Sequence, residues 1–307
     1  MDAVPRPERG PEGEFREYVW AGPLLGAAAG LGGLVVSAVG YRSGGLPPVL
    51  HRGLPSPSLT LLFSLDGPVV GGDSAGQARS ADAIRTDIVV GGLHQRPVYL
   101  EQPPHEEGIQ LDLHPLAARA LLGLPAGALA TPSVIPGAEV LGARAAEIRD
   151  RLRGTDDWAR RFALLAAYLR RRAADAHPDR AVRPEVAEAW TWLARHRGAG
   201  TLEGLSRHVA LGPRRLGTLF RAETGLSPKQ AARMMRFQHA RSAVVRAAGG
   251  GGPLDLSGVA AGCGYFDHSH LVRDFHQYTG VSPTAWLAEE CRNIQAGAHR
   301  YEAQWEA

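Results

Sequence analysis

Hydrophobic residues in the second half of the chain repeat in two similar units. In each unit, two groups of apolar residues follow helical spacing and are separated by a short break. In the first unit these residues are Leu202, Leu205, Val209, Leu216, Leu219 and Phe220, and in the second Leu256, Val259, Leu271 and Phe275. Phe220 and Phe275 are 55 residues apart, but Leu202 and Leu256 are 54 apart, so the second unit has one extra residue in its turn.

Residues that begin and end helices support this interpretation. Pro213 and Asp267 stand where the second helices should start, as an N1 residue and an N-cap. Gly225 and Gly280, again 55 apart, supply the left-handed residues that end these helices. A Ser-Pro pair then starts the next helix in both units. Two short helices joined by a tight turn form the helix-turn-helix pattern, so we predict two such units.

The outward side of each second helix is rich in hydrogen-bonding side chains. They are Arg214, Arg215, Thr218 and Arg221 in the first unit, and His268, Ser269, His270, Arg273 and His276 in the second. Residues 201–275 contain ten Lys and Arg against five acids, a net charge of +5. Such side chains contact base edges and phosphates, although the solvated face of a helical bundle has a similar composition. The repeated turn chemistry favours double-stranded DNA as the partner.

Residues 256–286 contain two further runs, Gly264-Tyr-Phe-Asp-His-Ser-His-Leu-Val-Arg-Asp-Phe275 and Thr279-Gly-Val-Ser-Pro283. With them, residues 184–290 resemble the DNA-binding domain of the AraC/XylS family of bacterial transcription regulators. The resemblance implies seven helices, with two helix-turn-helix units joined by one long helix, here residues 228 to about 246. It also implies base contacts by the first turns of both recognition helices, which places them at Arg214, Gly217, Thr218, His268, Ser269, Val272 and Arg273.

The first unit departs from the family's pattern at three positions. Gly212 stands where the family usually has a serine N-cap, Ala210 where it often has glycine, and Ser206 where it favours alanine. We expect these changes to hold the first helix-turn-helix less firmly. Gly217 has no side chain with which to contact a base.

The first half of the chain shows short strands and turns. Residues 34–41, 58–65, 87–90 and 108–114 read as strands, and residues 115–122 as a short helix with Pro115 at N1. Arg42 and residues 51–55 and 113–125 resemble the small β-rich sensor domain of some family members. We therefore expect an α+β fold: a β-rich regulatory domain at residues 31–176, a cupin-like barrel or a sandwich with flanking helices, and an all-α domain at residues 184–290.

The remaining segments are read from their composition. Residues 1–30 are rich in Pro, Gly, Glu and Arg at their start, which predicts disorder. Residues 21–40 are uncharged and long enough to span a membrane, but Pro23 and repeated glycines favour a flexible segment that leads into a strand. Residues 177–183 form the expected linker, and the tail at 291–307 is uninformative.

Residues 140–174 predict two helices with a break at 154–156, where Thr155 or Asp156 would be the N-cap. Trp158, Phe162, Leu165 and Leu169 form one apolar face on the second of these helices. That face would either make a homodimer contact, as such helices often do in relatives, or pack on its own β domain.

The alternative class of function is an enzyme. His94, His105, Glu106, Glu107 and His114 are possible metal ligands, but they lack a close His-x-His pair with a downstream glutamate. No nucleophile elbow, P-loop or dinucleotide fingerprint is present, and no cysteine precedes Cys263, which argues against the cysteine-dependent repair chemistry of some relatives. We therefore expect no catalytic residue, no metal and no cofactor. The two cysteines, Cys263 and Cys291, suit a reducing cytoplasm.

Together these observations predict a cytoplasmic, sequence-specific transcription regulator that binds a bipartite operator. The expected partners are double-stranded DNA, RNA polymerase and a small-molecule effector of the N-terminal domain, with a homodimer as a further possibility and no membrane. The competing hypothesis is a ligand-binding or metal-dependent enzyme with an accessory DNA-binding module. An apolar pocket in the β domain would favour a sensor, and converging acid and base groups an enzyme.

Overall fold

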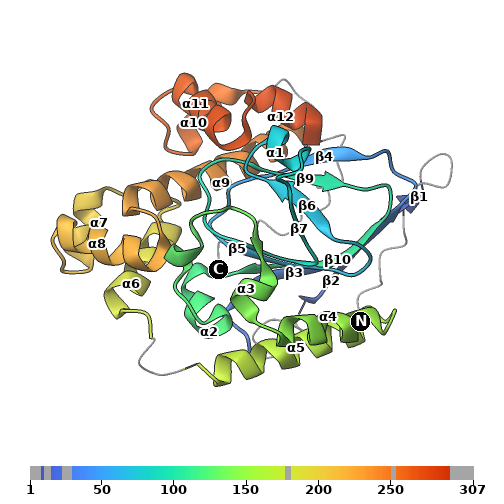
Figure 1. Ribbon diagram of the computed structural model, residues 1–307. Helices are drawn as coiled ribbons and strands as arrows, with labels where there is room; N and C mark the ends of the chain where they lie inside the picture. Colours follow the sequence, from blue (N-terminus) through green and yellow to red (C-terminus); the bar gives the residue numbers. More distant parts are fainter. Residues whose placement is uncertain (1–7, 10–14, 23–29, 177–180, 250–253, 291–307) are drawn as a thin grey trace. The chain divides into compact units, whose positions relative to one another are not determined.

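The structure, a computed structural model, describes residues 8–9, 15–22, 30–176, 181–249 and 254–290 (Figure 1). The chain forms two compact units, the first mainly of residues up to 181 and the second mainly of residues from 182 on. Among the described residues, all strands belong to the first unit and the second is helical. This is the α+β arrangement expected from the sequence.

The larger sheet of the first unit has the strand order β1-β2-β3-β10-β5-β8-β11, and all its pairings are antiparallel. The strands predicted at residues 34–41, 58–65, 87–90 and 108–114 correspond to β3, β5, β8 and β10. The bounds of the strands are β1 (Glu8–Arg9), β2 (Phe15–Trp20), β3 (Val35–Gly44), β10 (Glu106–Leu113), β5 (Leu59–Ser64), β8 (Ile88–Gly91) and β11 (Ile135–Pro136).

A smaller antiparallel sheet packs on one face of the larger one. Its order is β4 (Val49–Gly53), β9 (Val98–Gln102), β6 (Val69–Gly72) and β7 (Ile84–Thr86), with α1 (Ala75–Ala78) after β6. Leu62 and Val89 of the larger sheet share a buried cluster with Val98 of the smaller one. The sheets therefore pack face to face as a sandwich, one of the two β architectures expected.

Helices cover the opposite face of the larger sheet. Leu61, Phe63, Ile109 and Leu111 point to this side and are fully buried. Helices α4 (Arg144–Arg153) and α5 (Trp158–Ala174) run side by side there (Figure 1). The other helices of the unit are η4 (Pro115–Ala117), α2 (Ala118–Leu122), η5 (Ala126–Leu129) and α3 (Gly137–Leu141).

The apolar face of α5 is used inside the first unit. Phe162, Leu165 and Leu169 are all buried there, and the ring of Trp158 lies so close to Gly40 of β3 that a Cβ atom at Gly40 would come within 2.4 Å of it. Of the two alternatives for this face, the structure shows packing on its own β domain. A homodimer stays a prediction, and it would have to use another surface.

The start of α5 also differs from the expected one. Its N-cap is Asp157, whose side chain accepts a hydrogen bond from the Ala159 amide at 2.9 Å. Thr155, one of the two expected N-caps, instead accepts from the Asp157 amide at 3.3 Å. Three candidate residues follow one another here, and the sequence does not distinguish them.

The expected disorder of residues 1–30 is wrong where β1 and β2 form. Strand β2 pairs with β3 along its whole length, from Phe15 opposite Gly44 to Trp20 opposite Val39. Its aromatic and β-branched residues favour a strand, but the neighbouring Pro and Gly residues obscure that signal in the sequence.

Other expectations fall partly outside the described residues. Residues 23–29 of the uncharged stretch, 177–180 of the expected linker and the tail at 291–307 are among these. Over the described ranges, no helix has both the length and the apolar character needed to cross a membrane.

The second unit consists of helices throughout its described residues. Trp190 of the first helix stacks on Phe220 of the third, with ring centroids 5.9 Å apart, and Phe237 of the long helix packs against Phe275 and Tyr278. The long helix thus contributes to the core beside the second repeated unit. In chain order the helices are α6 (Pro184–Arg195), α7 (Leu202–His208), α8 (Pro213–Thr224), α9 (Pro228–Gly249), α10 (Leu256–Gly262), α11 (His268–Thr279) and α12 (Pro283–Glu290).

Candidate nucleic-acid interface

The first helix-turn-helix consists of α7 and α8. Thr201 caps α7 by accepting a hydrogen bond from the Gly204 amide at 3.0 Å. The turn contains Ala210 in the left-handed region, with φ of 53°. Gly212 is the N-cap of α8 and, having no side chain, leaves that helix without a side-chain cap. The first helix-turn-helix therefore lacks both the glycine and the polar cap that its turn favours.

The second helix-turn-helix consists of α10 and α11 and has both of these features. Gly264 occupies the left-handed position with φ of 72°. The Asp267 carboxylate caps α11 by accepting a hydrogen bond from the His270 amide at 2.7 Å, as the sequence predicted. Asp255 caps α10 through the Gly258 amide at 2.9 Å. The second helix-turn-helix is thus the better capped of the two.

Both units end in the same hydrogen-bond network. The buried Thr224 hydroxyl donates to the Phe220 carbonyl at 2.8 Å and accepts from the Leu226 amide at 3.2 Å. Thr279 makes the equivalent bonds in the second unit, at 2.8 and 3.2 Å. The next residue in each unit is a left-handed glycine, with φ of 78° and 80°. The repeated Thr-Gly pair is therefore structural: it fixes the angle at which each recognition helix meets the following helix.

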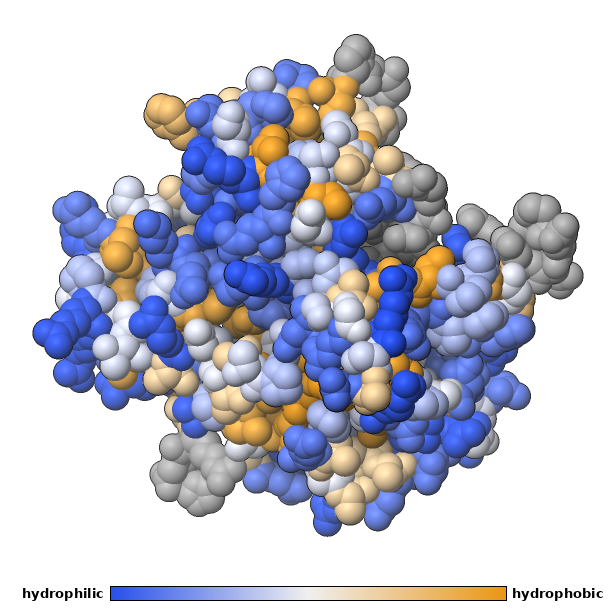
Figure 2. Space-filling view, turned by 45° about the horizontal axis from the view of Figure 1, so that its top comes forward, coloured by the Kyte–Doolittle hydropathy of each residue, from blue (hydrophilic) through white to orange (hydrophobic). Residues whose placement is uncertain are grey.

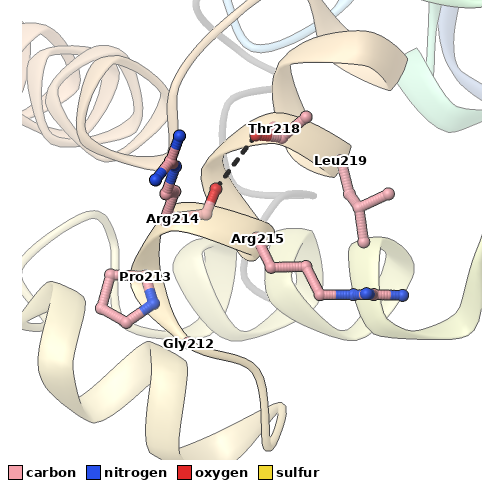
Figure 3. Close-up of a pocket in the computed structure, with 6 residues that line it drawn as sticks. All are labelled: Gly212, Pro213, Arg214, Arg215, Thr218 and Leu219. Atoms are coloured by element: carbon pink, nitrogen blue, oxygen red, sulfur yellow. Dashed lines mark hydrogen bonds between the residues drawn. The ribbon is translucent and has the colours of Figure 1, made fainter.

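The predicted residues of α8 lie on its exposed side. Figure 3 shows Arg214, Arg215 and Thr218 around a shallow hollow, with the two guanidinium groups pointing apart. The Thr218 hydroxyl donates to the Arg214 carbonyl at 3.1 Å. Arg221, one turn further along, is exposed as well. The helix therefore presents cations in more than one direction. The residues that line the hollow are Gly212, Pro213, Arg214, Arg215, Thr218 and Leu219.

Arg215 lies on the side of α8 that faces α6. The pKa of Glu185, on α6, is lowered by its own backbone amide and by Arg183, and also by the charge of Arg215. The charge of Arg215 therefore interacts with an acid of the same helical domain. Among the contacts of the described residues, no acid is paired with Arg214.

The predicted residues of α11 do not all lie on one surface. His268, Ser269 and Arg273 are exposed, whereas His270 is half-buried. The His270 ring packs edge-on against Tyr265 at 5.0 Å between centroids. Arg273 extends from the first two turns, and its Nε donates to the Ser269 carbonyl at 3.2 Å. Of the five residues expected on the outward side of this helix, the structure therefore leaves four exposed, His276 among them, and sets His270 apart.

Some of the positive charge counted in the sequence is used inside the unit. Arg233 of α9 forms an ion pair with Asp274 of α11 at 2.7 Å, and Asp274 is fully buried. Arg236 lies over the Tyr265 ring, 5.0 Å from its centroid. These arginines join α9 to the second helix-turn-helix. Sequence reasoning missed Asp274 and Tyr265, because neither spacing nor charge indicates which partner a residue meets across the fold.

Two of the possible metal ligands in the β-rich compact unit have other partners. Glu107 pairs with Arg161 at 2.6 Å and with Arg42, and His114 accepts from the Leu116 amide at 3.2 Å as the N-cap of η4. Among the residues that the structure describes, no group of three or more His, Cys, Asp or Glu side chains could hold a metal ion.

Residues 205–289 match the family model of the helix-turn-helix domain. This range begins within α7 and holds the rest of both helix-turn-helix units and the helix that joins them, and it contains the runs on which the resemblance rests. The C-terminal segment is an AraC-type helix-turn-helix domain. The protein that carries this AraC-type domain is accordingly a DNA-binding transcription regulator.

Several solved structures are similar to the chain. ToxT from Vibrio cholerae is 10% identical, with 82% of this chain and 96% of that chain covered and a TM-score of 0.45. The DNA-binding domain of AdpA, in complex with a target DNA, is 25% identical over 37% of this chain and 99% of its own, with a TM-score of 0.31. The C-terminal domain of AraT, a response regulator from Geobacillus stearothermophilus, is 21% identical over 35% and 87%, with a TM-score of 0.32. No curated protein matches the sequence.

Proposed function

We propose that the protein regulates transcription by reading a bipartite DNA site, with α8 and α11 in successive major grooves. The observation that carries this proposal is the pair of exposed recognition helices joined by one continuous helix. Helix α9 has 22 residues, which corresponds to about 33 Å at 1.5 Å per residue. Successive major-groove positions on one face of DNA are about 34 Å apart. One chain can therefore span two blocks whose centres are about ten base pairs apart.

Within this arrangement the exposed side chains have different roles. Arg214, Thr218, His268, Ser269 and Arg273 lie on the first turns of the recognition helices and would contact base edges. The geometry of Arg214 favours a guanine in the first block, because a guanidinium group binds the O6 and N7 atoms of guanine together. Arg215, Arg221 and His270 would contact phosphates or support the helices from the side.

The β-rich compact unit, mainly residues up to 181, has a surface through which a small molecule could control this activity. One face of the larger sheet packs on the smaller sheet at strands β5 and β8. The same face continues across β10, β3 and β2, and on these three strands its residues are partly exposed. Tyr18 lies opposite Tyr41 on this face. Aromatic and polar side chains together suit a small organic ligand. The residues of this surface are Tyr18, Trp20, Ser37, Tyr41, Gln110 and Asp112.

Selection of binding sites from a random duplex library by the full-length protein tests the DNA-binding part of the proposal. Arg214→Ala and Arg273→Ala should each cost about 1–3 kcal/mol of specific binding and relax base preference at one position of the selected site. Arg151→Ala, an exposed arginine of α4, is the matched control and should leave binding unchanged. Equal losses on selected and random DNA would make Arg214 and Arg273 phosphate contacts. Failure to select any sequence would refute the proposed function.

A further inference from the structure

Phe266 is far more exposed than the other large apolar residues that the structure describes. Its exposed fraction is 93%, whereas the next most exposed are Leu202 at 44% and Val49 at 41%. Figure 2 shows hydrophobic side chains as separate patches within a mainly hydrophilic surface. Single exposed apolar residues are common on protein surfaces, so the position of Phe266 in the fold decides whether its exposure has a function.

Phe266 is the extra residue in the turn of the second helix-turn-helix. In the first unit, one residue separates the left-handed position from the N-cap of the recognition helix. In the second unit there are two, Tyr265 and Phe266. Tyr265 is buried and packs on His270, so it takes the inward place. The insertion therefore adds an outward phenylalanine directly before the recognition helix α11.

The usual structural role of an apolar residue at this position does not apply. A residue just before the N-cap often packs on the fourth residue of the helix and fixes the entry of the chain, which is the hydrophobic staple. The fourth residue here is Leu271, which is fully buried. Phe266 has only a small part of its surface covered, so it does not form this contact.

The residues next to Phe266 belong to the proposed DNA-binding surface. Asp267, His268 and Ser269 form the exposed start of α11. An aromatic ring at this end of a recognition helix would lie beside the edges of the bases. The apolar group that the major groove offers is the C5-methyl group of thymine, which phenylalanine contacts favourably.

We propose that Phe266 is a specificity-determining residue that contacts the C5-methyl group of one thymine in the block read by α11. This inference rests on the proposed function, since it requires α11 to lie in the major groove. It assigns part of the selectivity of the second block to an apolar contact, beside the hydrogen bonds of His268, Ser269 and Arg273.

Replacement of thymine by deoxyuridine tests the contact, because it removes only the methyl group. In the duplex selected by the full-length protein, each thymine of the second block is replaced in turn, and the dissociation constant is measured by fluorescence anisotropy. We expect one replacement to weaken binding about fourfold, the factor that follows from burial of one methyl group. Phe266→Ser should bind the thymine and deoxyuridine duplexes equally, and Phe266→Leu should retain part of the difference.

The controls separate this inference from the proposed function. Val49→Ser removes an exposed apolar side chain from β4 of the β-rich unit and should keep the full fourfold difference between thymine and deoxyuridine. The melting temperature of Phe266→Ser should equal that of the wild type, because little of the ring is covered. A selected second block without a thymine, no effect of deoxyuridine, or an effect that persists in Phe266→Ser would each overturn the inference while DNA binding stands. Loss of all sequence preference in the wild type would overturn both.

Discussion

Ala210 and Gly264 hold equivalent left-handed positions in the two turns, but only Gly264 is suited to one. A left-handed alanine costs roughly 1–2 kcal/mol, and a glycine there would lose about 0.5–1 kcal/mol more conformational entropy on folding. Ala210→Gly should therefore stabilise the protein by about 0.5–1 kcal/mol. The free energy of unfolding, measured by urea denaturation, checks this value.

Gly264→Ala is the matched reverse change. It should destabilise the protein by about 1 kcal/mol, because it places a side chain at φ of 72° and brings a Cβ atom to 3.3 Å from that of Ala199. A loss of stability in Ala210→Gly, or no loss in Gly264→Ala, would show that these turns do not carry the strain that their backbone angles imply.

At the scale of single residues, the sequence predicted most of what is local. Gly225, Gly280 and Asp267 have the conformations or caps expected of them, because turn and cap chemistry depends on neighbours in the chain. The partial burial of His270 and the exposure of Phe266 depend on an inserted residue and on packing within the helical domain. The extra residue was visible in the spacing of the repeats, but its orientation was not.

At the scale of elements, the ion pair between Arg233 and Asp274 joins α9 to α11. Asp274 is fully buried, whereas 34% of the Arg233 side chain is exposed. Arg233→Ala would leave a buried carboxylate without its partner and should cost about 3 kcal/mol. Asp274→Ala should cost clearly less, because the remaining guanidinium group can reach water. Denaturation of both variants measures the difference, and equal costs would contradict this account of the pair.

Glu107 of β10 holds α5 on the sheet through Arg161, and it also pairs with Arg42 of the neighbouring strand β3. Burial alone would raise the pKa of Glu107, but the hydrogen bonds from Arg161 and Arg42 outweigh it and lower the pKa below its usual 4.5. A lowered folded pKa stabilises the protein above the unfolded value, and this stabilisation is lost as pH falls through the folded value. Glu107→Gln should therefore cost about 2 kcal/mol at pH 7, and the cost should shrink below pH 4.5.

The neighbouring Glu106 provides the control with opposite sign. Its burial raises the pKa, despite hydrogen bonds from Gln102 and Ser43. The charged form is then disfavoured in the folded state, so Glu106→Gln should be neutral or stabilising at pH 7, with an advantage that disappears at low pH. Thermal melts of both variants between pH 3 and pH 7 provide the test. Parallel pH profiles for the two variants would contradict it.

The elements themselves were predicted unevenly, for physical reasons. Long periodic helices such as α5 and α8, and the central strands β5 and β10, have clear patterns of burial. Strands β6, β7 and β11 are short and form by pairing with distant segments, which a local pattern does not indicate. The sequence also left open which surface the apolar face of α5 contacts, and that choice depends on the sheet.

At the scale of the whole molecule, the expected separate domains predict a functional fragment. The helical compact unit has its own buried core. Residues 181–290 should therefore fold alone and bind the selected DNA as a monomer. Sedimentation velocity and anisotropy measure these two properties, with the full-length protein as the control. An unfolded fragment, or one that binds DNA only as a dimer, would contradict the expected domain organisation.

The central claim is that one chain reads two DNA blocks on the same face, and the spacing of the blocks tests it most directly. Five base pairs inserted between the blocks move one of them to the opposite face of the duplex. Because α9 is a continuous helix, the two units cannot follow, and the affinity of the 181–290 fragment should fall at least about tenfold, or 1.4 kcal/mol. Base changes of the same number outside both blocks are the control. Undiminished binding to the duplex with the insertion would show that a single unit engages DNA.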